Sequence, residues 1–217
     1  MDLETRSPHQ KLFRIGRRPD PWAPPDWSNA HDDGTFGNRF DDPKRRYRVI
    51  YASSQRLGCY LETLARFRPD LSLLAEFSEI EGDNDFTPLG SVPLSWFEKR
   101  SMGSAQATGF YADIFSSGWL AHLRKTLAVV AIQLGIRDID TSVLQSTLPR
   151  RFTQMASFEV WSANLDGIFY RSRFGHDLEN WAIFEPFNIS DVTCDDLRID
   201  DACLIEAMTI HQLQIGA

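Results

Sequence analysis

The stretch from Gly37 to Ala65, GNRFDDPKRRYRVIYASSQRLGCYLETLA, decides the architecture of this chain. A basic loop leads into a short apolar run, residues 49–52, which is typical of a buried strand. Residues 55–67 then carry leucines at three- and four-residue spacing, which predicts a helix with one apolar face. Ser53 and Ser54 stand where a helix N-cap is expected. The stretch therefore predicts a loop, a strand and a helix in immediate succession.

Three side chains of this unit suit an anionic, glycosidic substrate. Arg39 offers a planar fork of donors that matches phosphate, and Tyr51 offers an aromatic face for a base or a cation. Glu62 offers a carboxylate that can offset positive charge at a reacting sugar carbon. Each also has an ordinary structural interpretation: an arginine paired with an aspartate, a tyrosine packed in the core, and a glutamate paired with Arg66 one turn later.

The other segments predict strands and helices in irregular order, which favours an α+β domain over a doubly wound sheet. They comprise a Pro- and Gly-rich loop (16–38), a strand (74–80), a helix begun by Ser116 or Ser117 and ended by Gly135 (119–134), a helix (150–161), a strand (168–173), a turn (175–177) and an antiparallel partner strand (181–184).

The composition of the 217 residues excludes several classes of protein. A formal net charge of −7 argues against general nucleic-acid binding, and no apolar run approaches membrane length. The N-terminus lacks the apolar core of a secretory signal, and three scattered cysteines favour a reducing compartment, so we expect a cytoplasmic protein. The histidines and cysteines show no metal-ligand spacing, and no glycine-rich phosphate loop is present, so neither a metal nor a prosthetic group is expected.

Charge is distributed unevenly along the chain. Arginines and two lysines concentrate within the first fifty residues, whereas Arg198 is the only Lys or Arg from His176 onward. A local cationic site in an acidic protein suits a small phosphorylated ligand, although both segments could equally be solvated faces.

Two blocks of the sequence together resemble the RES domain family, which is named for its arginine, glutamate and serine. The first block contains Arg-Phe-Asp-Asp-Pro at 39–43, Ile-Tyr-Ala at 50–52 and Tyr-Leu-Glu-Thr at 60–63. The second is Asp-Gly-Ile-Phe-Tyr-Arg-Ser-Arg at 166–173, and Phe-Arg-Ile-Gly at 13–16 is a weaker match. The resemblance spans residues 12–187.

The resemblance implies a single domain with a split, mostly antiparallel sheet and helices, similar to ADP-ribosyltransferases. Residues 12–187 would form the domain, 1–11 an N-terminal extension, and 188–217 an acidic segment packed on the domain or continuing it. It also implies the site: Glu62 and Ser172 as catalytic residues, and Arg39, Tyr51 and Arg14 as ligand-binding residues. Ser172 would hydrogen bond to the amide or the ribose of the substrate.

By the same resemblance, the chain would cleave the nicotinamide–ribose bond of NAD, with water or phosphate as acceptor, and would deplete NAD as the toxin of a toxin–antitoxin pair. NAD would be a substrate, and the antitoxin a separate chain with a helix-turn-helix region. Direct binding to nucleic acid or membrane is not expected. Two alternatives remain open from the sequence: an ADP-ribosyltransferase that modifies a protein, and a non-catalytic domain that binds a nucleotide or a partner.

Overall fold

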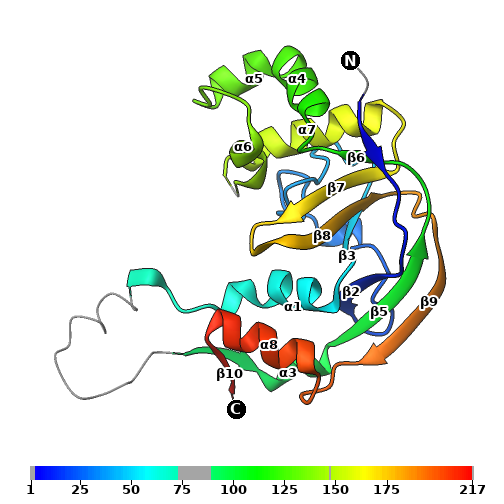
Figure 1. Ribbon diagram of the computed structural model, residues 1–217, viewed down its shortest axis with the longest axis vertical. Coiled ribbons are helices and arrows are strands. Elements are labelled where there is room, and N and C mark those ends of the chain that lie inside the picture. Colours follow the sequence, from blue (N-terminus) through cyan, green and yellow to red (C-terminus); the bar gives the residue numbers. More distant parts are fainter. Residues whose placement is uncertain (1–2, 73–88, 147, 217) are drawn as a thin grey trace.

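A computed structural model describes residues 3–72, 89–146 and 148–216. In these segments one curled eight-stranded sheet runs in the order β1-β6-β7-β8-β3-β2-β5-β9, and only β6 and β7 pair in parallel (Figure 1). Its strands are β1 (Thr5–Arg6), β2 (Leu12–Arg17), β3 (Val49–Ser53), β5 (Arg100–Ala107), β6 (Tyr111–Asp113), β7 (Gly167–Ser172), β8 (Gly175–Phe184) and β9 (Ile189–Asp196). The expected α+β class with a mostly antiparallel sheet is confirmed. The strand expected at 74–80 lies outside the described residues.

The helices form two groups at opposite ends of the molecule (Figure 1). One group contains α4 (Ser117–Thr126), α5 (Ala128–Gln133), α6 (Thr141–Gln145) and α7 (Arg150–Ser162). The other contains α1 (Arg56–Leu64), α3 (Leu94–Glu98) and α8 (Ala202–His211), with a small parallel sheet of β4 (Gly90–Pro93) and β10 (Leu213–Gly216) beside them. Two short 3-10 turns, Trp27–Asn29 and Ala65–Phe67, complete the described elements. None of the helices in the described segments is long and apolar enough to cross a membrane.

The large sheet is almost divided where β2 meets β3. These two strands are paired at one position, with Phe13 opposite Ser53, whereas β3 pairs along its whole length with β8, and β2 along its whole length with β5. The expected split of the sheet therefore appears as a seam between β2 and β3.

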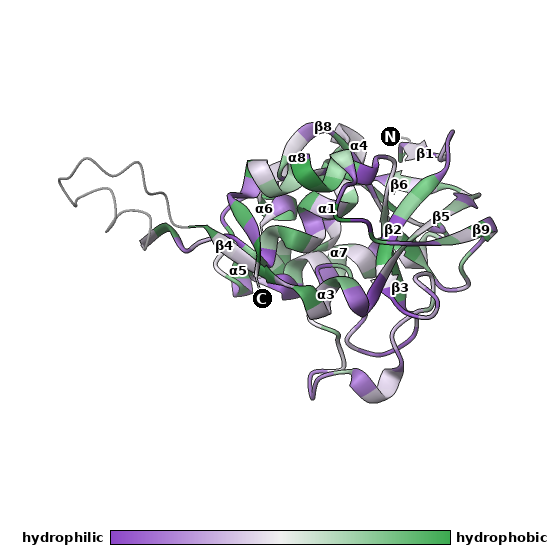
Figure 2. Ribbon diagram, turned by 90° about the horizontal axis from the view of Figure 1, so that it is seen from below, coloured by the Kyte–Doolittle hydropathy of each residue, from purple (hydrophilic) through white to green (hydrophobic). Residues whose placement is uncertain are grey.

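Hydrophobic side chains bury both helical groups against the sheet. Phe152, Val160 and Trp119 of the first group pack over Tyr170 and Ala182. In Figure 2 the hydrophobic residues gather where the helices meet the sheet, and the outlying loops are mostly hydrophilic. Burial of this apolar surface fixes the first helical group over one end of the sheet.

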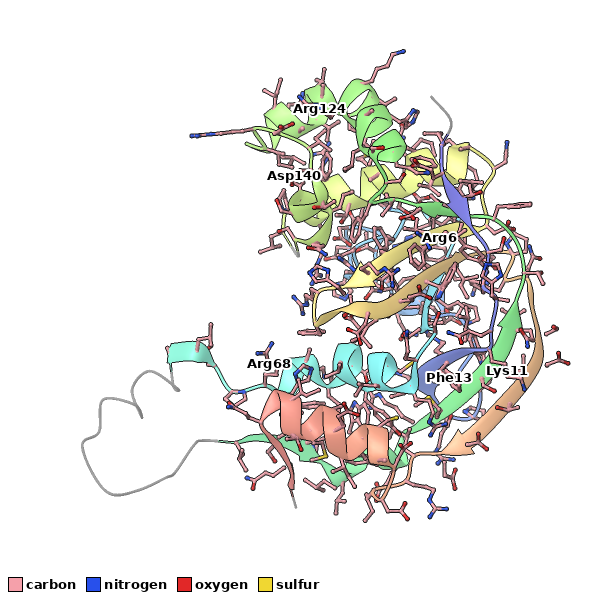
Figure 3. All side chains as sticks on the ribbon, in the orientation of Figure 1. Arg6, Lys11, Phe13, Arg68, Arg124 and Asp140 are labelled. Atoms are coloured by element: carbon pink, nitrogen blue, oxygen red, sulfur yellow. The ribbon has the colours of Figure 1, made fainter. Side chains whose placement is uncertain are left out.

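The second group is held together around α1. Leu61 and Leu64 of α1 are buried together with Leu204 of α8, and Phe13 of β2, labelled in Figure 3, packs against the same cluster. Polar contacts tie α1 to the distant α8 region as well. Asp201 accepts hydrogen bonds from Arg56 (2.5 Å) and Tyr60 (3.0 Å), and His211 Nε2 donates to the Leu61 carbonyl oxygen (2.9 Å).

The expectation that Ser53 or Ser54 caps the helix was wrong. The residue at the N-cap of α1 is Gln55, and its side chain makes no capping bond. Ser53 Oγ instead donates to the Glu179 carbonyl oxygen (2.9 Å), and Ser54 Oγ accepts from Trp181 Nε1 (2.9 Å). Both hydroxyls are buried and used to hold β3 to β8, so they cannot turn toward the amides of α1.

The helix predicted at 119–134 is interrupted. Ser116 caps α4 as expected, by accepting from the Trp119 amide, and Gly135 ends α5 with a φ of 73°. Between them Leu127 leaves helical geometry, with φ −110° and ψ 10°. The core contains both Leu127, at the break, and Ala131, one turn later.

The hairpin after β7 also turns earlier than predicted. Ser172 pairs with Gly175, so the turn consists of residues 173 and 174 and β8 already begins at Gly175. The helix predicted at 150–161 and the strand at 49–52 are confirmed by α7 and β3.

Candidate active site

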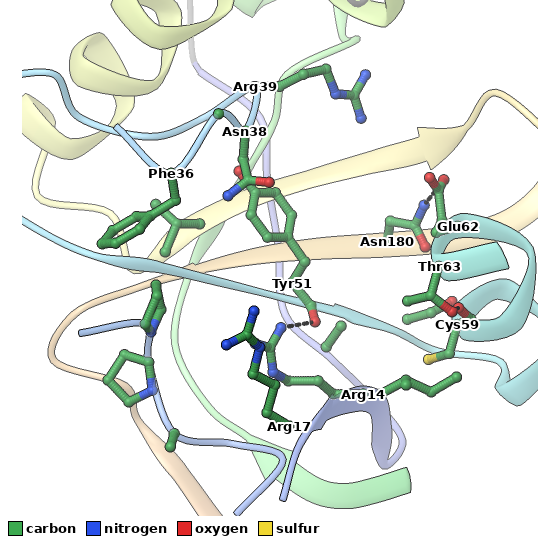
Figure 4. Close-up of a pocket in the computed structure, with 18 of the residues that line it drawn as sticks. Arg14, Arg17, Phe36, Asn38, Arg39, Tyr51, Cys59, Glu62, Thr63 and Asn180 are labelled. Carbon is green, nitrogen blue, oxygen red and sulfur yellow. Dashed lines mark hydrogen bonds between the residues drawn. The ribbon is translucent and has the colours of Figure 1, made fainter. Parts of the chain in front are cut away.

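A cleft of about 880 Å³ lies on the sheet face that both helical groups partly cover. Its lining includes Tyr51 of β3, Asn180 of β8 and Tyr170 of β7, together with α1 and the loop that follows β2 (Figure 4). Asn180 lies directly opposite both Ser53 and Tyr170 in the sheet register, so these residues share one face. The volume is within the range of about 300 to 1,000 Å³ usual for small-molecule sites.

Glu62 projects into this cleft from α1. The helix buries Leu61 and Leu64 on its other side, which leaves the carboxylate toward β7 and β8. Glu62 Oε1 accepts hydrogen bonds from Ser172 Oγ (2.7 Å) and from Asn180 Nδ2 (2.8 Å). Within the described segments Glu62 forms no ion pair, so the alternative pairing with Arg66 does not hold it.

Gly58 allows α1 to approach the sheet at this point. A Cβ atom at residue 58 would lie 2.3 Å from Ser53 Oγ and 3.8 Å from Asn180 Oδ1. The first distance is shorter than side-chain atoms tolerate, so only glycine lets the turn that precedes Glu62 lie against β3 and β8.

Ser172 lies behind Glu62. Its side chain is at the end of β7 and only 2% exposed, and its Oγ accepts from the Phe174 amide (3.0 Å) while donating to Glu62. Because a hydroxyl has one proton, this donor is already used by the carboxylate. The structure thus brings Ser172 to the predicted catalytic glutamate, at a position where it does not line the cleft.

Arg14 spans the seam of the sheet. Its Nε donates to the Pro21 carbonyl oxygen (2.7 Å) and its Nη1 to the Tyr51 carbonyl oxygen (2.8 Å), the contact drawn in Figure 4. Burial lowers the pKa of Arg14 to about 10. Two of its five N–H donors therefore bind backbone carbonyl oxygens. The side chain also lines the cleft, where its other three N–H donors are available to a ligand.

Arg39 lies over the aromatic floor of the cleft. Its guanidinium carbon is 4.7 Å from the centre of the Tyr170 ring, and its Nη1 donates to the Leu144 carbonyl oxygen (3.2 Å). In the part of the chain that the structure describes, Arg39 has no carboxylate partner, so the aspartate pairing considered from the sequence is not what holds it.

The loop before β3 holds Arg39 and Tyr51 in place through Asp41 and the Phe40 amide. Asp41 accepts from the amides of Phe36 and Asn38 (both 2.8 Å), which closes the turn around residue 39. Phe40, next in the chain, donates its amide to the Tyr51 hydroxyl (3.1 Å). Burial raises the pKa of Tyr51 well above its ordinary value, so the ring that lines the cleft stays neutral.

Asp42 anchors the other end of that loop. It accepts from the Arg46 amide (2.7 Å) and from two guanidinium nitrogens of the same residue (2.8 and 2.6 Å). The Arg-Phe-Asp-Asp-Pro motif is thus a rigid turn that presents Arg39 to the cleft.

The cleft is strongly cationic, although the chain as a whole is acidic. Among the described residues that line it are six arginines and three carboxylates: Arg14, Arg17, Arg18, Arg39, Arg150 and Arg173, with Asp20, Asp26 and Glu62. Such a balance favours an anionic ligand. The described residues contain no group of three or more His, Cys, Asp or Glu side chains placed to hold a metal ion.

Sequence reasoning did not select Asn180, Arg150 or Arg173 for the site. Arg173 follows the Tyr170–Ser172 block directly, so its position was a usable signal. Asn180 has no such signal, since a regular two-residue turn would place Asp177 opposite Tyr170, and a register shift between Arg171 and Ser172 brings Asn180 there instead. Arg150 begins a distant helix, α7, and has no local signal.

The chain belongs to the RES domain family, because the family model of the RES domain matches residues 11–200. A search of curated proteins finds no match to this chain. Among solved structures, the chain is similar to a chain of the crystal structure of the M. tuberculosis MbcT–MbcA toxin–antitoxin complex. The sequence identity is 11% and the TM-score 0.48, over 95% of this chain and 91% of that one.

Proposed function

We propose that this protein cleaves the bond between nicotinamide and ribose in NAD. One observation carries the proposal: an acceptor-only carboxylate, Glu62, is held by two donors inside a cleft lined by six arginines. NAD has the complementary chemistry, with a positively charged pyridinium at the reacting carbon and a diphosphate farther along. Membership of the RES family supports the same conclusion.

In the proposed reaction the bond between ribose C1 and the nicotinamide nitrogen breaks, and its electron pair leaves with nicotinamide. The positive charge that develops on the ribose is offset by Glu62. An oxygen of water or of inorganic phosphate then bonds to C1, and water loses its proton to solvent.

The other predicted residues take supporting roles. Arg39 binds the diphosphate through the guanidinium donors that do not bind the Leu144 carbonyl oxygen, and the ring of Tyr51 accepts the flat, cationic pyridinium. Ser172 acts through Glu62 and not by direct contact with substrate, because its proton is already donated to that carboxylate.

At the level of the cell, we propose that the protein is the toxin of a toxin–antitoxin pair and acts in the cytoplasm, with NAD as substrate and no prosthetic group. Its antitoxin would be a separate chain with a helix-turn-helix region. The family membership and the cationic lining of the cleft support this assignment.

The decisive experiment uses purified protein freed of any partner. NAD is incubated with and without phosphate, and the products are identified by mass spectrometry. Release of nicotinamide with ADP-ribose indicates hydrolysis, and release with a phosphorylated ADP-ribose indicates phosphorolysis. Label transferred from NAD to an added protein would instead assign an ADP-ribosyltransferase. Intact NAD bound to folded protein would contradict catalysis.

A further inference from the structure

We infer that Asn180 is a positioning residue, which fixes the Glu62 carboxylate so that one defined oxygen faces the substrate. The inference rests on the proposed function, because it assigns a role within the same reaction. It concerns a residue that sequence reasoning did not select.

The sheet holds Asn180 in a fixed place. It lies on β8, flanked by Ser53 of β3 and Tyr170 of β7, and its side chain is buried, at 2% exposure. Strands on both sides therefore fix its backbone. A buried amide at such a point needs hydrogen-bond partners, and its Nδ2 donates to Glu62 Oε1 over 2.8 Å (Figure 4).

Two donors from different strands bind the same oxygen of Glu62. Ser172 and Asn180 both donate to Glu62 Oε1, at 2.7 and 2.8 Å. Two fixed donors on one oxygen define the plane of the carboxylate, which a single donor would leave free to rotate. In the described segments no hydrogen bond is made to Oε2, so Oε2 remains to meet charge on the substrate.

The amide of Asn180 is a donor without net charge, which suits this position. A lysine or arginine at residue 180 would form an ion pair with Glu62 and neutralise the charge that the reaction needs. An amide donates a hydrogen bond while it carries no net charge. Asn180 thus orients Glu62 and leaves its negative charge available.

The ionisable groups around Glu62 allow a clean test. Cys59 of α1, Tyr170 of β7 and His211 of α8 interact electrostatically with Glu62, and Arg173 lines the same cleft. Burial raises the pKa of Cys59 to about 12, raises that of Tyr170 strongly, and lowers that of His211. From about pH 6.5 to pH 9 these three groups therefore stay neutral.

The test compares Asn180→Asp with Asn180→Ala. In Asn180→Asp two carboxyl groups at hydrogen-bond distance share one proton over an extended pH range. While Asp holds that proton it donates to Glu62 as the amide does. We therefore expect kcat for NAD cleavage near wild type at the acidic end and a fall of about tenfold or more toward pH 9. Asn180→Ala should show a low kcat at every pH, with KM little changed.

Asn188 supplies the matched control. Its Nδ2 also donates to a carboxylate, Asp166 Oδ1 (2.9 Å), but it is exposed and does not line the cleft. Asn188→Asp and Asn188→Ala should keep the wild-type kcat and pH profile. Wild-type kcat in Asn180→Ala, or the same pH profile in Asn180→Asp and Asn188→Asp, would overturn the inference.

A second measurement does not depend on catalysis. Crystal structures of wild type and of Asn180→Ala compare the orientation of the Glu62 carboxylate. Loss of the Asn180 donor should let the carboxylate leave its wild-type plane or occupy more than one rotamer. An unchanged, singly ordered carboxylate would refute the positioning role even if NAD proves not to be the substrate. Absence of NAD cleavage by wild type, with the expected change of the carboxylate, would refute only the proposed function.

Discussion

The guanidinium group of Arg14 on β2 donates to the backbone carbonyl oxygen of Tyr51 on β3, at 2.8 Å, where the two strands have stopped pairing. The same group binds the Pro21 carbonyl oxygen, in the loop that walls the cleft. One side chain thus connects both halves of the sheet and the loop. Arg14 was predicted as a ligand-binding residue. In the structure, two of its donors connect β2 to β3 and to the loop after β2.

Arg14→Lys should lower the free energy of unfolding by about 2 kcal/mol, since one ammonium group cannot replace both hydrogen bonds from a charged donor. Urea unfolding measures the change. Arg17→Lys is the matched control, because Arg17 lies on the same strand, is exposed and lines the same cleft. If both variants lost the same free energy of unfolding, the hydrogen bonds of Arg14 across the seam would make no specific contribution to stability.

Glu62→Gln should lower NAD turnover on the order of a hundredfold or more, because it removes the charge that offsets the cationic transition state. The glutamine carbonyl can still accept from Ser172 and Asn180, so the thermal midpoint should hardly change. Steady-state kinetics and thermal unfolding are measured on the same samples. Glu206→Gln, an exposed residue of α8, serves as control. Wild-type turnover in Glu62→Gln would remove this residue from the site.

Ser172→Ala should lower turnover less than Glu62→Gln does, because Glu62 keeps its charge and the bond from Asn180. The loss should appear in kcat, since the buried hydroxyl does not line the cleft. Circular dichroism checks that the fold is retained. A change confined to KM would instead place the hydroxyl in direct contact with NAD.

Arg39→Ala should raise KM more than it lowers kcat, because the diphosphate is remote from the reacting carbon and its binding is equal in ground and transition states. Arg39→Lys tests the fork geometry, and we expect it to recover only part of the affinity. Initial rates over a range of NAD concentrations separate the two constants. An unchanged KM with a reduced kcat would exclude the phosphate role.

Asp42→Asn should weaken the folded state in a pH-dependent way. Burial raises the pKa of Asp42, but hydrogen bonds from Arg46 and Lys44 outweigh burial, and the resulting pKa lies below the ordinary value. A carboxyl group whose pKa is depressed in the folded state stabilises that state at pH values above its unfolded pKa of about 3.9. This stabilisation is lost as the pH falls through the folded-state pKa. We expect Asn to cost about 2 kcal/mol at neutral pH, and less under acid conditions.

Asp41→Asn is the matched comparison for that experiment. Burial raises the pKa of Asp41, so its contribution to the pH dependence has the opposite sign, and an asparagine oxygen can still accept from the Phe36 and Asn38 amides. Urea unfolding near pH 7 and near pH 3 should distinguish the neighbours. If the free energy of unfolding changed with pH in the same way in both variants, the opposite pKa shifts of Asp41 and Asp42 would be contradicted.

Much of the site could be predicted because it is local in the sequence. Arg39, Tyr51 and Glu62 lie within one loop–strand–helix unit, and each of those elements has a pattern that short-range physics explains. Glu62 faces the cleft because the leucines of its own helix determine the buried side.

The remainder depends on strand register. Asn180 meets Glu62 only because β8 pairs with β3 and β7 at that residue, and no local pattern encodes that pairing. Ser53 was mistaken for part of a helix cap for the same reason, since its hydroxyl is used across strands. The place of Ser172 behind Glu62 likewise follows from the turn at 173–174.

The contacts between α1 and α8 have a consequence for synthesis on the ribosome. Asp201 binds Arg56 and Tyr60 from 145 and 141 positions away, and His211 binds Leu61 from 150. Because chains emerge and fold from the N-terminus, α1, the helix that carries Glu62, is synthesised early. Its contacts with Asp201 and α8 can form only near the end of translation. A nascent chain stopped before residue 201 would leave that helix unsupported, so truncated products should not assemble the carboxylate end of the cleft.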